Sequence, residues 1–268
     1  MHLFQKNIPE SLRREAFGLH FAHPVGLAPG LDPEGRKYNS YRNCSFVEIG
    51  PLGPSEAVPG ADTRYGWRKA PASGEALDPL RQAIANIQAR PPKVLLAANI
   101  APLSSRPDSD SVTSDLMQSF TYLYDFVDLF VIDTFRKNND GVAPLQSAEF
   151  LSETMDALLD MRICYEVSKP ILIRVDTDIL PGSLAGLLDY MMLSGLDGII
   201  AGHEKYPLEL IRRIGYFTGG RFPIIACGEI DTPDKADELL AAGAVFLQAT
   251  GRKNARQILN HLIDPSSF

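Results

Sequence analysis

Eight short, almost continuously apolar segments recur along this chain of 268 residues. They are rich in aliphatic residues and do not alternate between apolar and polar positions, as a strand with one solvated face would. Strands covered on both faces of a parallel sheet have this composition. Eight is also the number of strands that closes a (β/α)8 barrel of about 250 residues. The segments begin at His23, Ser45, Lys93, Val127, Pro170, Leu196, Phe222 and Ala244.

The segments between the later apolar runs have the helical period, with apolar residues three and four positions apart. Ser114 and the Asp231-Thr232-Pro233 segment offer helix-start residues. A doubly wound open sheet would have similar units, but the G-x-G-x-x-G turn that usually follows its first strand is absent. We therefore predict an α/β fold, a single-domain TIM barrel over residues 1–268 with residues 1–16 as an N-terminal extension. Helices are expected at 114–126, 148–167, 184–193, 208–217 and 235–242.

Composition and charge exclude several classes of protein. The formal net charge is −7, which argues against a nucleic-acid surface. The three cysteines include no C-x-x-C pair, so we expect neither a disulfide framework nor a zinc site, and a reducing compartment. No apolar run approaches the roughly 20 residues of a membrane span. We predict a cytoplasmic protein whose first 17 residues pack on the barrel or, alternatively, contact a membrane surface. The sequence leaves a homo-oligomer open.

The C-terminal ends of the predicted strands are the expected place for a site, because barrel enzymes build their sites there. Residues 51–78 and 101–112 follow two strand ends and are rich in Gly, Pro and Ser, so each is a candidate site wall or else an ordered surface loop. The small residues at Gly228, Thr250 and Gly251 suit a phosphate on the last two loops. Glu229 would repel that anion unless its side chain turns outward.

Several segments resemble, in order and spacing, the flavin-dependent dihydroorotate dehydrogenases. Residues 17–32 read FGLHFAHPVGLAPGLD, where the family has approximately GLxFxNPVGLAAGLDK. FVEIG at 46–50, LIRRIGYFTGGRFPIIACGEID at 210–231 and AGAVFLQATG at 242–251 continue the likeness. The resemblance implies a TIM barrel with FMN at the strand ends and its phosphate on the last two loops. It also implies oxidation of dihydroorotate to orotate, with a hydride passing to the flavin.

The resemblance carries a set of cofactor-binding candidates over to this chain. Asn99 would hydrogen-bond the flavin or the substrate, and small residues near position 30 would let the flavin lie against the backbone. Arg174 stands where the family has a lysine beside the flavin; it keeps the positive charge in a bulkier, planar group. The full set is Ala28, Gly30, Asn99, Asp133, Arg174, Gly202, Gly228, Thr250 and Gly251.

The chain departs from the family pattern at several positions. Pro33 replaces the lysine that ends the first motif, and Pro51 replaces a threonine. The catalytic base, a Ser or Cys in the family, falls at Arg136, which cannot act as a base. Gly202-His203 replaces a Thr-Asn pair, and the loop that follows is short. The catalytic residue is therefore left unassigned.

Plainer interpretations accompany these candidates. Asn99, Asp133 and Arg174 would also fit a satisfied polar layer at the barrel mouth that binds nothing. His203 and Glu204 are either a surface turn or a substitute acid/base pair. Cys227 at a strand end is more typical of a buried small side chain than of a nucleophile.

The sequence assigns no definite role to the remaining acidic residues and does not identify an electron acceptor. Asp176 and Asp178 would cap a helix or face a ligand. Without ligand spacing we expect no metal site. The electron acceptor, the substrate and the retention of FMN stay open.

The sequence thus predicts a dihydroorotate dehydrogenase-like FMN oxidoreductase of pyrimidine metabolism with an altered catalytic site and a small-molecule substrate. The alternative is a catalytically inactive homologue of the same fold. It would bind a phosphate-bearing ligand or a protein partner.

Overall fold

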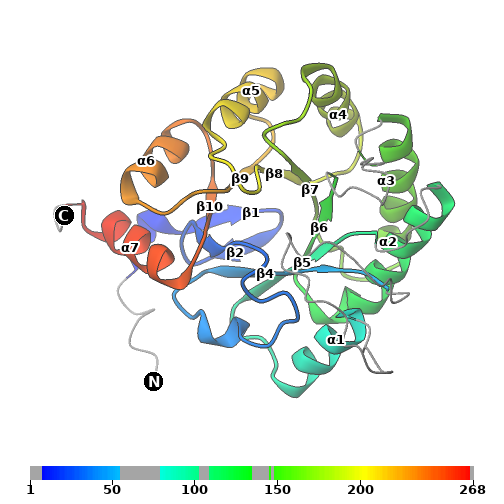
Figure 1. The fold of residues 1–268 in the computed structure, drawn as a ribbon, viewed down its shortest axis with the longest axis horizontal. Coiled ribbons are helices and arrows are strands. Elements are labelled where there is room, and N and C mark those ends of the chain that lie inside the picture. The colour runs from blue at the N-terminus through cyan, green and yellow to red at the C-terminus, as the bar shows by residue number, and fades with distance from the viewer. Residues whose placement is uncertain (1–7, 55–78, 103–108, 135–144, 146–147, 266–268) are drawn as a thin grey trace, which may run out of the picture.

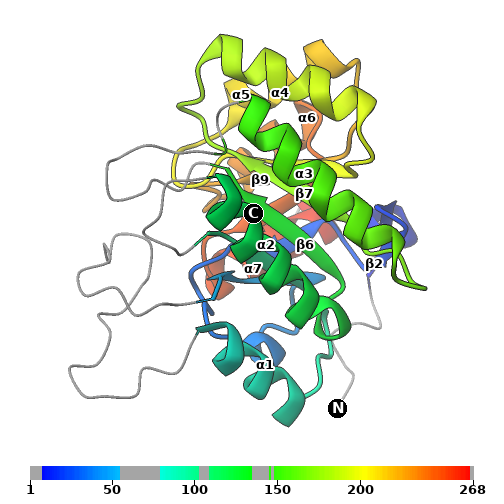
Figure 2. The ribbon, with the colours of Figure 1, turned by 90° about the vertical axis from the view of Figure 1, so that its right-hand side faces the viewer.

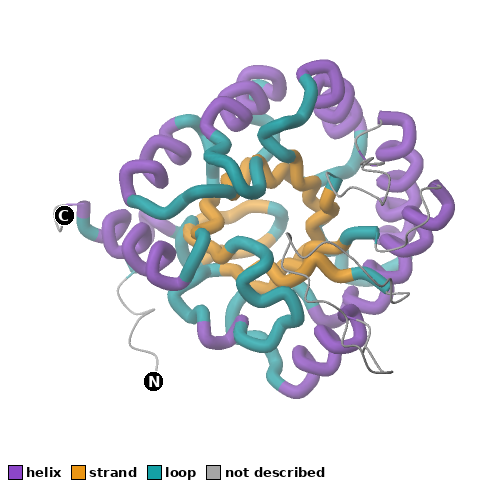
Figure 3. Tube along the Cα trace, in the orientation of Figure 1, coloured by secondary structure: helices purple, strands orange, loops and turns teal. Residues whose placement is uncertain are grey.

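The computed structural model describes residues 8–54, 79–102, 109–134, 145 and 148–265. Eight parallel strands close into a barrel in the order β10-β3-β4-β5-β6-β7-β8-β9, which confirms the predicted TIM barrel. Figures 1 and 3 show the ring of strands at the centre, with helices outside it. The strands are β3 (Val25–Leu27), β4 (Phe46–Leu52), β5 (Leu95–Ile100), β6 (Leu129–Asp133), β7 (Ile171–Val175), β8 (Gly198–Ala201), β9 (Ile224–Cys227) and β10 (Phe246–Ala249).

The described residues include seven α-helices, all outside the barrel (Figure 1). All five predicted helices are present, and Thr232 caps α6 as expected, its hydroxyl accepting from the Lys235 N–H at 3.4 Å. Ser114 as a helix start is wrong, because the helix already begins at Ser109. The helices are α1 (Pro79–Ala89), α2 (Ser109–Leu123), α3 (Ala148–Ile163), α4 (Pro181–Leu193), α5 (Leu208–Thr218), α6 (Pro233–Ala241) and α7 (Arg252–Ile263).

Two helices, α1 and α7, were not predicted from the sequence. Helix α7 carries charged and polar residues on most of its surface and buries only Ala255, Ile258 and Leu259, so its apolar stripe is narrow. Short 3-10 segments are also found in the part of the chain that the structure describes. They are η1 (Glu10–Leu12), η2 (Tyr38–Ser40) between β3 and β4, and η4 (Tyr124–Phe126).

The apolar core has two parts, separated by the wall of the barrel. The larger part lies between the strands and the surrounding helices, which pack along the outside of the barrel (Figure 2). The smaller part fills the barrel interior, because alternate residues of each strand point inward. Its members are Phe21, Ala28, Phe46, Ala97, Leu129, Val131, Leu172, Ile200, Ile225, Cys227 and Phe246.

A short antiparallel hairpin, β1 (Arg14–Ala16) and β2 (Leu19–Phe21), closes the N-terminal end of the barrel. The Phe21 ring lies 4.4 Å from that of Phe246, and Phe17 stacks on Phe246 at 5.9 Å between ring centroids. At the first residue of β8, Gly198, a Cβ atom would lie 2.4 Å from the Phe17 ring, so only glycine fits. This end of the barrel is therefore packed with aromatic rings, and the described part of the first 16 residues includes strand β1.

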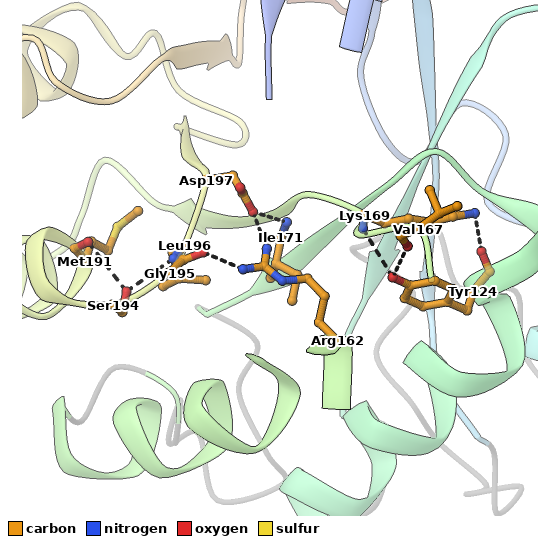
Figure 4. A network of polar contacts seen from close by, with 10 residues as sticks. All are labelled: Tyr124, Arg162, Val167, Lys169, Ile171, Met191, Ser194, Gly195, Leu196 and Asp197. Atoms are coloured by element: carbon orange, nitrogen blue, oxygen red, sulfur yellow. Dashed lines mark hydrogen bonds and ion pairs between the residues drawn. The ribbon is translucent and has the colours of Figure 1, made fainter. Parts of the chain in front are cut away.

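The same side of the molecule carries a polar network that ties α3 to the starts of β7 and β8 (Figure 4). The Asp197 carboxylate accepts hydrogen bonds from Arg162 at 2.6 Å and from the backbone N–H of Ile171 at 2.8 Å. Arg162 also donates to the carbonyl of Gly195 at 2.8 Å. Beside it, the Tyr124 hydroxyl donates to the Val167 carbonyl at 2.6 Å. These contacts serve stability, since barrel sites lie at the opposite end.

Among the helices that the structure describes, none has the length and apolar character needed to cross a membrane.

Candidate functional site

The nine residues predicted to bind a cofactor all lie at or just after the C-terminal ends of barrel strands. Seven of the eight strands contribute one or two of them, and β4 contributes none. Asn99, Asp133 and Arg174 are on the strands themselves, and each is 5% exposed or less. The others follow strands: Ala28 and Gly30 after β3, Gly202 after β8, Gly228 after β9, and Thr250 and Gly251 after β10.

A buried polar layer crosses the barrel interior above the aromatic rings. Its centre is Glu48 on β4, whose side chain is fully buried. One carboxylate oxygen accepts from Asn99 Nδ2 at 3.0 Å and from Arg174 Nη2, and the other accepts from Gln248 Nε2. Charged groups in a barrel interior need such partners, because an unpaired buried charge is very costly.

Arg174 reaches this layer from β7 and is fully buried. Its Nη2 also lies 3.4 Å from Gln248 Oε1, and its Nη1 donates to the Gly202 carbonyl at 3.4 Å. Burial is the largest single effect on Arg174 and disfavours its charge, but Glu48, Cys227 and Asp133 together outweigh it and raise the pKa of the guanidinium. Arg174 therefore stays charged, and its charge is paired inside the protein.

Two buried atoms of this layer have no hydrogen-bond partner among the described residues. They are Oδ1 of Asn99, an acceptor, and Nε of Arg174, a donor. Buried polar atoms without partners are uncommon in folded proteins. The interpretation of a fully satisfied polar layer is therefore wrong for these two atoms, and a ligand that offers one donor and one acceptor would satisfy them.

Glycines let the loops after β8 and β9 pack closely beside the layer. A Cβ atom at Gly202 would lie 2.2 Å from the Cys227 carbonyl oxygen, and one at Gly228 would lie 2.3 Å from the Lys205 carbonyl oxygen. Both glycines have positive φ, +92° and +110°. The Lys205 side chain bridges to both carboxylate oxygens of Asp178 at 2.7 and 2.8 Å, which links the loops after β7 and β8.

His203 is the first residue beyond Gly202, and its side chain is 22% exposed. Burial, followed by the positive charge of Arg174, lowers its pKa from 6.5 to about 4. The imidazole is therefore neutral at pH 7, and it is a weaker base than a solvent-exposed histidine. Its Nε2 lies 4.0 Å from the carboxylate of Glu204, which is 71% exposed. The two side chains thus differ in environment: His203 lies largely inside the site, and Glu204 faces solvent.

The two loops predicted to hold a phosphate have backbone features of an anion site. Gly251 precedes α7 as its N-cap residue, and no side chain caps the helix there. The Thr250 hydroxyl accepts from the Asn254 side chain at 3.1 Å. Glu229 is exposed and has a φ of 33°. Phosphate binding at these loops stays a prediction, as does the binding role of all nine residues.

Sequence reasoning missed two members of the layer, Glu48 and Gln248. The signal was present, because Glu48 and Arg174 are opposite charges, each inside an otherwise apolar strand. Two such residues in one barrel must pair with each other or with other polar groups. Gln248 occupies the matching inward position of β10, directly beside Cys227 in the strand register.

Other candidates lie outside the described residues or play minor parts. Arg136 and most of the two proposed site walls, 55–78 and 103–108, fall in segments that the structure does not describe. Cys227 is buried, and burial raises its thiol pKa, which fits the interpretation as a packing residue. Neither Asp176 nor Asp178 caps α4, whose N-cap is Leu180. No group of three or more potential metal ligands occurs within the described ranges.

Comparison with known proteins places this geometry in context. No model of a protein family matches the chain. The chain is 28% identical to the dihydroorotate dehydrogenase (quinone) of Christiangramia forsetii over 88% of its own length and 78% of that protein. It is 28% identical to the same enzyme of Nautilia profundicola, over 88% of its length and 73% of that protein. The chain is therefore similar to dihydroorotate dehydrogenases over most of its length.

Solved structures of dihydroorotate dehydrogenases share the fold of this chain. The Eimeria tenella enzyme in complex with ferulenol matches 96% of this chain and 85% of its own, with a TM-score of 0.78 and 18% sequence identity. The ligand-free form matches 98% of this chain and 90% of its own, also with a TM-score of 0.78, at 17% identity. At such identities the likeness concerns the barrel alone.

Proposed function

We propose that this chain is an FMN-dependent oxidoreductase of pyrimidine metabolism that acts on dihydroorotate or a close analogue. The observation that carries the proposal is the pair of buried, unpartnered atoms on Asn99 and Arg174 at the strand ends. Similarity to the dihydroorotate dehydrogenases supports the choice of cofactor and substrate.

The residues present fit a flavin. Its ring system offers N–H and C=O groups along one edge, which complements an acceptor on Asn99 and a donor on Arg174. Gly30 lies beyond β3, and no atom of the described residues is within 4 Å of where its Cβ would be, so these residues leave room for a flat ring there. Gly228, Thr250 and Gly251 would hold the phosphate. Bound FMN supplies the hydride acceptor for oxidation of a CH–CH bond.

The chain's own residues then bind the substrate and accept its proton. We assign the proton-accepting role to His203, which is neutral at pH 7 and adjoins the polar layer through Gly202. The backbone of its loop is held in place by close packing on Gly228 and by the pair between Lys205 and Asp178. A base fixed in this way loses little freedom when the substrate binds.

The first test is binding. The purified protein should be yellow or become yellow on titration with FMN, and Asn99→Ala should weaken FMN binding about ten-fold, because one hydrogen bond to a buried acceptor is lost. Glu209→Gln is the control, since Glu209 is an exposed carboxylate in the first turn of α5, outside the polar layer. Wild-type protein that binds no FMN under any condition would refute the proposed function.

The second test is turnover with dihydroorotate and an artificial electron acceptor. His203→Gln should lower kcat at least a hundred-fold and leave the FMN dissociation constant within two-fold of wild type, because the base contributes about 10²–10⁴-fold. Full activity in His203→Gln would refute the assignment of the base. FMN binding without turnover by the wild type would favour the alternative, an inactive homologue that binds a ligand.

A further inference from the structure

Glu48 holds Arg174 through one nitrogen only. The carboxylate contacts the Nη2 atom of the guanidinium, while Nε has no hydrogen-bond partner among the described residues. Gln248 and Asn99 fix the carboxylate itself, through Nε2 and Nδ2. With four hydrogen-bonded groups in a fully buried layer, the guanidinium has little freedom to rotate.

The second effect of Glu48 is electrostatic. Arg174 brings one positive charge to the strand ends, and Glu48 places one negative charge in direct contact with it. Asp133 pairs with Arg174 in the register of β6 and β7, and its carboxyl adds negative charge near the guanidinium. A ligand at the strand ends therefore meets a hydrogen-bond donor on Arg174. The positive charge of that guanidinium is already balanced by the neighbouring carboxylates.

We propose that Glu48 is a positioning residue for Arg174. It fixes the guanidinium through Nη2, leaves Nε to donate to the ligand, and cancels the positive charge that would otherwise stabilise an electron-rich, anionic ligand. This inference rests on the proposed function, since the ligand that reports on it is FMN, whose reduced form carries more negative charge than its oxidised form.

The first variant is Glu48→Gln, which keeps the size and the hydrogen-bonding capacity of the side chain and removes its charge. The measurements are the dissociation constant of oxidised FMN and the midpoint potential of the bound flavin. The variant should bind reduced FMN at least ten-fold more tightly relative to oxidised FMN, a rise of about 30 mV for a two-electron couple. Glu209→Gln, which removes an exposed carboxylate from the first turn of α5, should leave this ratio within two-fold of wild type.

The second variant tests whether Glu48 acts through Arg174. In Arg174→Met, burial favours the neutral form of the carboxyl that has lost its cation. Adding Glu48→Gln to this background should therefore leave the potential unchanged. An equal rise in both backgrounds would mean that Glu48 acts on the flavin directly, and would overturn the inference.

The third variant, Glu48→Asp, keeps the charge and shortens the side chain by one methylene. It should leave the potential unchanged and weaken binding of oxidised FMN about ten-fold, because Arg174 is no longer held at the same place. It also tests the inference if Glu48→Gln does not fold. Unaltered FMN binding in Glu48→Asp, or an unaltered potential in Glu48→Gln, would overturn the inference and leave the proposed function intact. Absence of FMN binding by the wild type would overturn both.

Discussion

Replacing Gly228 with alanine tests how closely the loops after β8 and β9 pack at the candidate site. The added Cβ would lie 2.3 Å from the Lys205 carbonyl oxygen, a backbone atom that cannot swing aside. The φ of +110° adds strain for any residue with a side chain. Backbone strain costs about 1–3 kcal/mol, and overpacking costs a further 1–3 kcal/mol.

The expected loss in the free energy of unfolding is therefore about 4 kcal/mol. For a chain of this size, about 2–4 °C per kcal/mol gives a fall in Tm of roughly 8–16 °C. Thermal unfolding followed by far-ultraviolet circular dichroism measures this fall directly.

Gly182→Ala provides the matched control. Gly182 lies in α4, and among the residues that the structure describes no atom is within 4 Å of where its Cβ would be. Alanine there should leave Tm unchanged or raise it, because alanine is the better helix former by up to about 1 kcal/mol. If the Tm of Gly228→Ala is within about 2 °C of the wild-type Tm, the inference that the loops after β8 and β9 pack closely is wrong.

Three further predictions concern stability, pH and thiol chemistry. Asp197→Ala should lower the free energy of unfolding by about 2 kcal/mol in urea titrations, because Arg162 and a backbone N–H lose their acceptor; it should not alter FMN binding. Burial lowers the pKa of both His23 and His203 from 6.5 to about 4, so the unfolded chain takes up protons first on acidification. The free energy of unfolding should thus fall between about pH 6.5 and pH 4, by up to about 1.4 kcal/mol per pH unit for each histidine, and less steeply in His203→Gln. A thiol reagent should modify one cysteine rapidly in the native protein, the exposed Cys164, since the other two are buried; rapid modification of all three would contradict the packing.

The barrel could be predicted from the sequence because its strands are covered on both faces. Each of the eight runs is apolar at almost every position, a pattern that depends on local sequence alone. The hairpin of β1 and β2 lacks that signal, since each strand has only three residues and its burial depends on distant partners such as Phe246. Helix α7 was missed for a related reason, because three buried residues in twelve are a weak pattern.

The candidate site was predicted in its position and only partly in its chemistry. Asn99 and Arg174 were found because each lies at a strand end, where barrel sites occur. That Glu48 and Gln248 join them depends on the register and closure of the sheet, which bring β4, β5, β7 and β10 to one interior layer. The low pKa of His203 likewise depends on burial and on Arg174, 29 positions away in the chain.

The hairpin at the N-terminal end has a consequence for how such a chain can diverge. Aromatic packing of Phe17, Phe21, Phe46 and Phe246 anchors one end of the barrel without any contribution from the residues that face a ligand. Side-chain substitutions at the strand ends that avoid the close-packed glycines Gly202 and Gly228 therefore leave this anchor intact. The end that anchors the barrel and the end that carries the candidate site can therefore change separately.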